Sequence, residues 1–130
     1  MNGSTDTRFA GMRVLVLEDE ALVAMLLEEM LADCGCETIG PFAALSEAEA
    51  FVAGQPDGAD AAIIDVNVAG QPSYPLAARL AAGGIPFAFS TGYDPGGIPA
   101  EWRGRPALSK PFMLPDLERV LGLLRSNAPA

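Results

Sequence analysis

The chain has 130 residues, half of them hydrophobic, and its 17 acidic against 8 basic residues give a formal net charge of −9. This length and composition predict a single folded domain and argue against intrinsic disorder. The chain contains no histidine, which excludes Ser-His-Asp and Cys-His nucleophilic catalysis, histidine-ligated zinc and a phosphohistidine of its own. The acidic balance argues against binding to nucleic acid or to an anionic membrane, so we expect protein partners.

The ends of the chain and its cysteines carry no sign of export. Segment 1–11 is polar and lacks the apolar stretch of a signal peptide, and no apolar run approaches the roughly 18 residues of a membrane span. We therefore expect a cytoplasmic protein with a disordered tail at 1–11, one domain at 12–125 and a short tail at 126–130. Cys34 and Cys36 are too few for a four-cysteine metal site and too close for an easy disulfide, so we expect both to be reduced.

The first elements alternate between strand and helix patterns. Met12 to Leu17 (MRVLVL) predicts a buried strand that ends at the acidic triplet Glu18-Asp19-Glu20. Apolar residues at helical spacing from Leu22, with acidic residues opposite, predict an amphipathic helix that ends near Gly35. A weaker strand pattern follows from Cys36 to Gly40.

The middle of the chain repeats the pattern. Ser46 is expected to cap a short helix that runs through Phe51, with Glu49 as its capping-box partner. The run Ala61 to Asp65 (AAIID) predicts a second buried strand stopped by a carboxylate. A helix from Ser73 to Ala82 follows, with a proline tolerated in its first turn and two glycines ending it.

The last third holds two more apolar runs and a final helix. Pro86 to Thr91 (PFAFST) ends in a hydroxyl, and the weaker run Arg105 to Lys110 ends in the single lysine of the chain. Segment 92–104 is rich in glycine and proline, so any helix within it must be short. Leucines at helical spacing predict a last helix from Leu114 to about Arg125. This alternation predicts an α/β fold, a parallel sheet with helices on both faces.

Each of these apolar runs ends at residues with a polar or charged side chain. They are two carboxylates at Glu18 and Asp19, a third at Asp65, a hydroxyl at Thr91 and an ammonium at Lys110. Since ligands bind at the carboxyl ends of the strands in such sheets, these side chains are expected to meet there. Each of them alone has an ordinary structural explanation, such as an acidic helix N-terminus. Their order at successive strand ends is the specific feature.

This set of groups suits phosphoryl transfer. Clustered carboxylates repel one another unless a cation lies among them, and oxygen ligands without His or Cys select Mg²⁺ or a similar ion such as Mn²⁺. Asp65 would be the nucleophile that becomes an aspartyl phosphate. Thr91 and Lys110 would hold the transferred group, lysine acting as a compact positive charge.

The motifs VLVLEDE, IIDVN, FSTGY and LSKPF resemble those of receiver domains of two-component response regulators, over roughly Met12 to Arg125. The resemblance implies a flavodoxin-like, doubly wound sheet of five parallel strands in the order 2-1-3-4-5. A fourth helix would be short or irregular, because segment 92–104 is rich in glycine and proline. It further implies a phosphoprotein that signals by protein binding, rather than an enzyme, with no output domain.

The same resemblance assigns roles residue by residue. Asp65 would be the phosphoacceptor, Thr91 the switch hydroxyl and Lys110 the phosphate-binding lysine, joined to Pro111 by a cis peptide bond. Gly92 matches a position whose size controls access to the phosphate. The implied ligands of the metal are Glu18, Asp19, Asp65 and the backbone carbonyl of Asn67. The implied partners are a histidine kinase or histidine phosphotransfer protein as donor and an unknown downstream protein, with no nucleic acid and no membrane.

The chain departs from the family pattern near the lysine. Receivers commonly carry Tyr or Phe three residues before the lysine, and this chain has Ala107 there. Tyr93 and Trp102 are the candidates to replace that aromatic, although both also suit ordinary packing. The absent aromatic and the FSTGY run resemble the alphaproteobacterial single-domain regulators named for a Phe-Ala-Thr-Gly-x-Tyr motif, with Ser90 in place of Ala and one residue missing.

Two other functions stay open on the residues alone. One is a Mg²⁺-dependent phosphohydrolase with an aspartate nucleophile, as in haloacid-dehalogenase-like enzymes. Those enzymes usually carry Asp-x-Asp on the first strand, whereas this chain has Asp65-Val66-Asn67 on a later one. The other is a pseudo-receiver that only binds proteins, which the presence of every phosphorylation residue disfavours.

Overall fold

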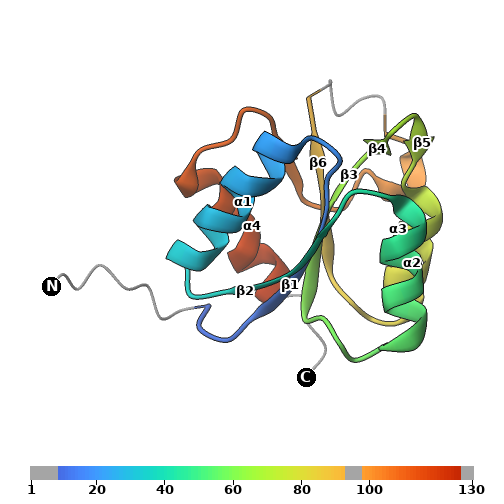
Figure 1. Cartoon of the computed structure of the whole chain (residues 1–130), viewed down its shortest axis with the longest axis horizontal. Helices are drawn as coiled ribbons and strands as arrows, with labels where there is room; N and C mark the ends of the chain where they lie inside the picture. Colours follow the sequence, from blue (N-terminus) through green and yellow to red (C-terminus); the bar gives the residue numbers. More distant parts are fainter. Residues whose placement is uncertain (1–8, 93–97, 127–130) are drawn as a thin grey trace, which may run out of the picture.

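The computed structural model describes residues 9–92 and 98–126. Its centre is a five-stranded parallel sheet in the order β2-β1-β3-β6-β7 (Figure 1). The strands of this sheet are β1 (Arg13–Leu17), β2 (Glu37–Phe42), β3 (Ala61–Asp65), β6 (Phe87–Thr91) and β7 (Ala107–Ser109). Numbered along the chain, this order is 2-1-3-4-5, so the predicted α/β fold and topology are confirmed.

Helices cover both faces of the sheet. In Figure 1, α1 (Ala21–Asp33) and α4 (Leu114–Ser126) lie on one side, and α2 (Leu45–Gly54) and α3 (Tyr74–Ala82) lie on the other. Between β6 and β7, the described residues form a single 3-10 turn at Ala100–Trp102, labelled η2. Within the described residues, no helix is both long and apolar enough to cross a membrane.

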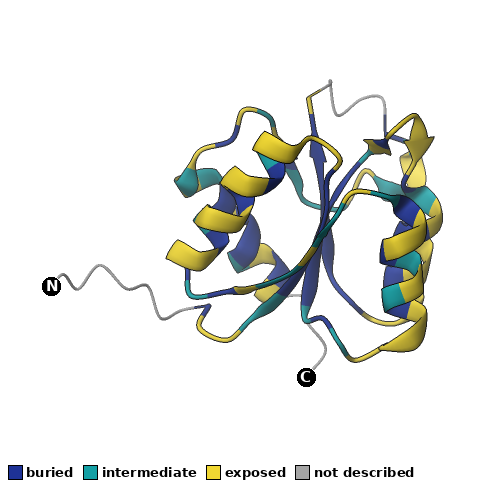
Figure 2. Cartoon of the chain, in the orientation of Figure 1, coloured by how far each residue is buried: buried dark blue, intermediate teal, exposed yellow. Residues whose placement is uncertain are grey.

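The core is split into two layers by the alternation of side chains along the strands. Val14, Val16 and Ile63 belong to the layer under α1 and α4, while Leu15 and Ile64 belong to the layer under α2 and α3. Figure 2 shows the three inner strands β1, β3 and β6 as mostly buried, between helices that are exposed on their outer sides, whereas the edge strand β2 is intermediate to exposed. Burial on both faces explains why the runs read as continuous apolar segments in the sequence.

Some local expectations need correction. Ser46 does not cap α2: the helix begins at Leu45 after Ala44, without a side-chain hydrogen bond at its start. Leu45 is buried in the layer under α2, so its packing favours a helix that begins one residue before the polar side chain. Phe9 is buried in the core layer under α1 and α4, so packing begins three residues before Met12. Cys34 and Cys36 are buried thiols and form no disulfide.

A small hairpin after β3 was not anticipated. Its strands β4 (Asn67–Val68) and β5 (Gln71–Pro72) pair antiparallel. The two residues between them, Ala69 and Gly70, both have positive φ angles, of 52° and 84°. This is the conformation that two-residue hairpin turns require, and it is unusual for alanine. The hairpin lies at the carboxyl end of β3 and forms one wall of the candidate site described next.

Candidate functional site

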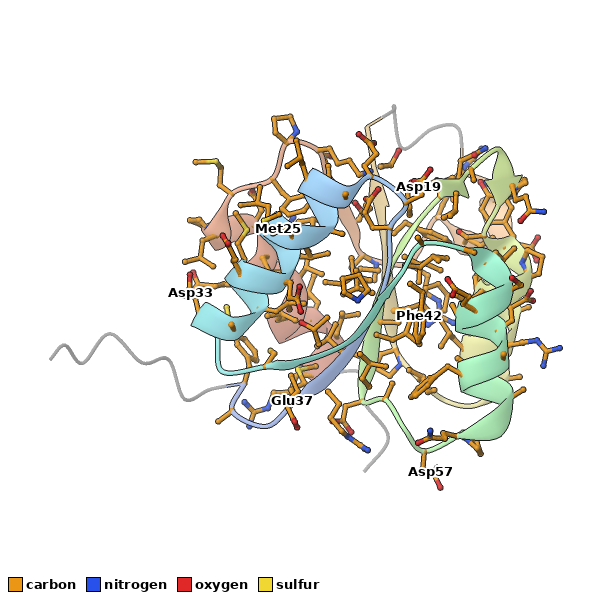
Figure 3. The ribbon with its side chains drawn as sticks, in the orientation of Figure 1. Asp19, Met25, Asp33, Glu37, Phe42 and Asp57 are labelled. Atoms are coloured by element: carbon orange, nitrogen blue, oxygen red, sulfur yellow. The ribbon has the colours of Figure 1, made fainter. Side chains whose placement is uncertain are left out.

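The candidate residues gather at the carboxyl edge of the sheet. Glu18 directly follows β1, Asp65 ends β3, Thr91 ends β6 and Lys110 directly follows β7. Figure 3 shows Asp19 at this edge and Asp57 at the opposite end of the molecule. Parallel pairing with these registers brings residues from four separate segments to one place, as the sequence pattern predicts.

Three carboxylates form the acidic part of the site. One oxygen from each of Glu18, Asp19 and Asp65 lies within 4.8 Å of the other two. Glu18 and Asp65 are buried, with 3% and 8% of their surface exposed, and Asp19 is exposed. Ionised carboxylates this close together require compensating positive charge.

Lys110 supplies that charge. Its Nζ lies 2.7 Å from Glu18 Oε1 and 2.9 Å from Asp65 Oδ2, and 3.7 Å from Glu20 Oε1. Because Lys110 follows β7 at the edge of the sheet, its side chain must pass over β6 to reach β3 and β1. The residue of β6 that alternation places on this face is Ser90, the register partner of Asp65.

The contacts change the protonation equilibria of two of these groups. Burial raises the pKa of the Glu18 carboxyl, and its hydrogen bonds with Lys110 and with the backbone of Glu20 oppose that shift only in part. Burial lowers the pKa of Lys110, but the hydrogen bonds to Glu18 and Asp65 outweigh it, so the net pKa of the lysine is raised. Lys110 is therefore an ammonium at neutral pH.

Backbone donors from the adjoining turns orient the carboxylates. The amide of Glu20 donates to Glu18 Oε2 at 3.0 Å, and the amide of Asn67 donates to Asp65 Oδ1 at 3.2 Å. The amide of Ala69, at the tip of the hairpin, donates to Asp19 Oδ2 at 3.1 Å. Sequence reasoning missed Ala69, since a backbone donor leaves no trace in residue type. The sequence offers one signal for it, the Ala69-Gly70 pair, which can form a two-residue hairpin turn.

These groups surround an open depression of about 640 Å³. It is lined by Asp19, Glu20, Asp65, Asn67, Ala69, Gly70, Gly92 and Lys110. Gly92 lies beside Thr91, which is buried and whose carbonyl accepts a hydrogen bond from the Lys110 amide at 2.9 Å. A Cβ at Gly92 would meet no atom within 4 Å, so the glycine leaves this wall of the depression open. The Lys110–Pro111 peptide bond is cis, as predicted.

The position three residues before Lys110 holds the small Ala107, and the candidate replacement Trp102 lies away from the site. Ala107 pairs in register with Phe89 of β6. Trp102 packs edge-on against Phe87, with ring centroids 5.8 Å apart, and Phe87 packs in the same way on Phe89. Phe87 begins β6 and Thr91 ends it, roughly 13 Å further along the strand. The Trp102 contact is thus at the end of β6 that lies away from the site, and Tyr93 lies outside the described residues.

The donor set fits a small divalent cation. Carboxylate and carbonyl oxygens are the ligands of Mg²⁺ and Mn²⁺, and three carboxylate oxygens converge here from the loop between β1 and α1 and from the end of β3. The depression beside them is open and leaves room for water and for a phosphoryl group. The arrangement can therefore bind a metal ion and present the Asp65 carboxylate to a phosphorylated molecule.

No family model matches the chain, and no curated protein matches it. Among solved structures, SdrG from Sphingomonas melonis Fr1 is 38% identical, with a TM-score of 0.78. That match covers 88% of this chain and 96% of SdrG.

Two further structures widen the comparison. The signal receiver domain of a modulated diguanylate cyclase from Desulfovibrio desulfuricans G20 is 27% identical, with a TM-score of 0.74, over 89% of this chain and 94% of that domain. The response regulator REC domain of PhyR from Erythrobacter litoralis is 24% identical, with a TM-score of 0.78, over 94% and 97%. At that identity the PhyR match supports the fold alone.

Proposed function

Because the chain belongs to the receiver domains of two-component response regulators, we propose that Asp65 accepts a phosphoryl group from a histidine of a partner protein. The donor is a histidine kinase or a histidine phosphotransfer protein. The relatives are signalling domains, and the output of this chain is then a change in protein binding.

The observation that carries the proposal is the position of Lys110 Nζ between Glu18 and Asp65, at 2.7 and 2.9 Å, beside an open depression. In the transfer, an oxygen of the Asp65 carboxylate attacks phosphorus, the bond from phosphorus to the donor imidazole breaks, and the imidazole leaves. Lys110 faces the position of the incoming group and offsets its negative charge. Asn67 holds the other carboxylate oxygen of Asp65 through its amide, which fixes the orientation of the nucleophile.

The metal site follows from the same residues. Glu18, Asp19, Asp65 and the backbone carbonyl of Asn67 would hold Mg²⁺ or Mn²⁺, which when bound neutralises the carboxylates and draws charge from the phosphoryl oxygens. Burial of Glu18 and the Ala69 amide on Asp19 keep these oxygens turned toward one another. Preorganised oxygens lower the entropic cost of binding the ion.

A response to phosphorylation can pass through Thr91 and Lys110. A phosphoryl group on Asp65 adds charge beside Lys110 and competes with Glu18 and Asp65 for its ammonium. Thr91 and Lys110 are joined by a backbone hydrogen bond, so a shift of one moves the other. The described segments that follow them, 98–106 and 111–113, then change position and alter the surface that a downstream protein binds.

The donor protein is expected to dock on the outer face of α1. Leu22 and Met25 on this helix have 79% and 52% of their surface exposed, and Met113, after β7, has 66% exposed. An apolar groove of about 310 Å³ beside them is lined by Val23, Leu26, Pro111 and Phe112, together with Glu20 and Lys110. We name the depression around Asp65 and Lys110 the phosphorylation pocket. Large apolar side chains next to it suit a partner helix that carries the donor histidine.

The test is the transfer of labelled phosphate from acetyl phosphate and phosphoramidate, with Mg²⁺ and with chelator. We expect wild type to take up label in the presence of Mg²⁺ and Asp65→Asn to take up none. Asp57→Asn is the matched control, since Asp57 is an exposed aspartate at the opposite end of the molecule (Figure 3), and it should behave as wild type.

Other outcomes would point to other functions. Equal labelling of wild type and Asp65→Asn would contradict the assignment of the phosphoacceptor. Steady release of phosphate from a generic phosphate ester would instead support a phosphohydrolase. Absence of both Mg²⁺ binding and labelling, from small donors and from phosphorylated kinases alike, would support a pseudo-receiver.

A further inference from the structure

Glu20 is a carboxylate at the site that the proposed function does not use. It directly precedes α1, its side chain is 67% exposed, and its Oε1 lies 3.7 Å from Lys110 Nζ. Its side chain lines the phosphorylation pocket and also the apolar groove next to it. Glu20 therefore stands at the boundary between the pocket and the surface on which a donor protein would lie.

Without a metal ion, the side chains that line the pocket carry more negative than positive charge. Among the described residues, the ionisable side chains that line it are Asp19, Glu20, Asp65 and Lys110. Lys110 is already bonded to Asp65 and to the buried Glu18. Asp19 and Asp65 are needed as metal ligand and nucleophile, so Glu20 is the one lining carboxylate whose charge serves neither purpose. A phosphorylated molecule entering the pocket is itself an anion and must pass this charge.

We propose that Glu20 selects between classes of phosphodonor, and this inference rests on the proposed function. Its negative charge repels small anionic donors, which have little binding energy with which to offset that repulsion. A protein donor docked on the α1 face gains contact energy away from the pocket and tolerates the same charge. Glu20 thus keeps the domain responsive to its partner protein rather than to free metabolites that carry an acyl phosphate.

This selection acts on the transfer of a phosphoryl group from the small donor to Asp65. With acetyl phosphate, an Asp65 carboxylate oxygen forms a bond to phosphorus, the bond from phosphorus to the acetate oxygen breaks, and acetate leaves with the electron pair. No oxidant or other reactant is needed. Glu20 touches none of these atoms in the proposal and acts through its charge alone.

A purely structural role for Glu20 would be to hold Lys110 in place. The distances argue against it, because the contact at 3.7 Å is longer than those to Glu18 and Asp65 at 2.7 and 2.9 Å. Exposed ion pairs also contribute little to side-chain placement. Loss of the Glu20 charge therefore leaves Lys110 bonded to two buried carboxylates.

The experiment compares labelling rates of wild type, Glu20→Gln and Glu29→Gln at saturating Mg²⁺. Glu29 is an exposed glutamate on α1, roughly 13 Å further along the helix axis, and serves as the matched control. We expect Glu20→Gln to react about threefold to tenfold faster with acetyl phosphate than wild type, from Coulomb repulsion screened by water and salt. The gain should be smaller with phosphoramidate, whose net negative charge is lower, and should shrink at high salt.

Two outcomes would overturn the inference. One is an equal rate for wild type and Glu20→Gln with acetyl phosphate. The other is a slower reaction of Glu20→Gln with both small donors, which would indicate that Glu20 positions Lys110. A failure of the proposed function looks different: wild type would then take up no label from either small donor or from any phosphorylated kinase, and the two variants would match it.

Discussion

Lys110 determines the state of the site at the scale of single residues. Its ammonium is the nearest positive charge to both Glu18 and Asp65 among the described residues, and both carboxylates are buried. A buried carboxylate without a partner is costly, because burial disfavours its charged form. The lysine is therefore a structural counter-ion in the absence of metal as well as a candidate phosphate ligand.

This gives a prediction for Lys110→Ala. Without a divalent cation, the substitution should lower the free energy of unfolding by about 2–3 kcal/mol, since it leaves Glu18 and Asp65 uncompensated. Added Mg²⁺ should recover part of that loss and should stabilise the variant more than wild type, which already holds a cation there. Urea unfolding with and without Mg²⁺ measures both effects.

The control for this experiment is Arg79→Ala, which removes an exposed cation whose contact with Glu49 is 3.7 Å long. It should change neither the stability nor the response to Mg²⁺ by a measurable amount. A Lys110→Ala protein as stable as wild type in chelator would contradict the counter-ion role.

At the scale of elements, an ion pair ties β1 to the segment that leads into β3. Arg13 donates from Nε and Nη2 to the two carboxylate oxygens of Asp60, at 3.2 and 3.0 Å, and its backbone amide donates to Oδ2 at 2.8 Å. The hydrogen bonds from Arg13 hold the pKa of Asp60 below its usual value of 3.8. This contact lies at the amino end of β1, the end away from the candidate site.

Because the pKa of Asp60 is lowered in the folded state, its ionised form stabilises the fold. The contribution of Asp60 is present at pH values above 3.8 and is lost as the pH falls through the lower pKa of the folded state. Asp60→Asn should therefore be less stable than wild type at neutral pH, and the difference should vanish in acid. Thermal unfolding across that range, with Asp33→Asn as an exposed control, measures it, and a constant difference would contradict the assignment.

The hairpin shows how an element can serve the site without any catalytic side chain. Its turn holds Ala69 in a left-handed conformation and thereby aims the Ala69 amide at Asp19. Strained residues of this kind are retained when the surrounding structure or the function fixes them. The hairpin thus extends the end of β3 into a wall of the pocket.

At the scale of the whole molecule, the outer side of α1 is the surface that we expect to meet the donor. The outer side of α1 is exposed in Figure 2, and Figure 3 places Met25 on this helix, at the same side of the sheet as α4. The exposed apolar residues Leu22 and Met25 adjoin the groove next to Lys110. A monomeric surface seldom keeps such side chains together unless another protein covers them.

We expect the double variant Leu22→Ala, Met25→Ala to slow phosphoryl transfer from its histidine kinase by about tenfold, the effect of losing two apolar contacts at an interface. The kinase is first identified by phosphotransfer profiling. Labelling by phosphoramidate should be unchanged, because the small donor needs no docking surface. Leu123→Ala, which truncates an exposed leucine of α4, is the control. Slower labelling by phosphoramidate as well would indicate damage to the fold rather than to docking.

The sequence by itself determined the order of the elements and the residues at their ends. The apolar runs stopped by Glu18, Asp65 and Thr91 are readable because a strand buried on both faces must be apolar throughout. The run before Lys110 is weaker because β7 is an edge strand with a single buried residue. Because the strands are parallel, the polar residues that end these runs then lie together at the carboxyl edge of the sheet. Neither step requires knowledge of side-chain packing, and the fold confirms both.

Other features were decided by the tertiary structure. The start of α2 at Leu45 and the burial of Phe9 follow from core packing, which overrides local capping and composition signals. The Ala69 amide reaches Asp19 across 50 positions of sequence, and Glu20 comes within 3.7 Å of Lys110 across the sheet. Contacts of this kind depend on the register and twist of several strands at once. Residue types can indicate which groups meet at the site, but only the folded chain fixes the distances between them.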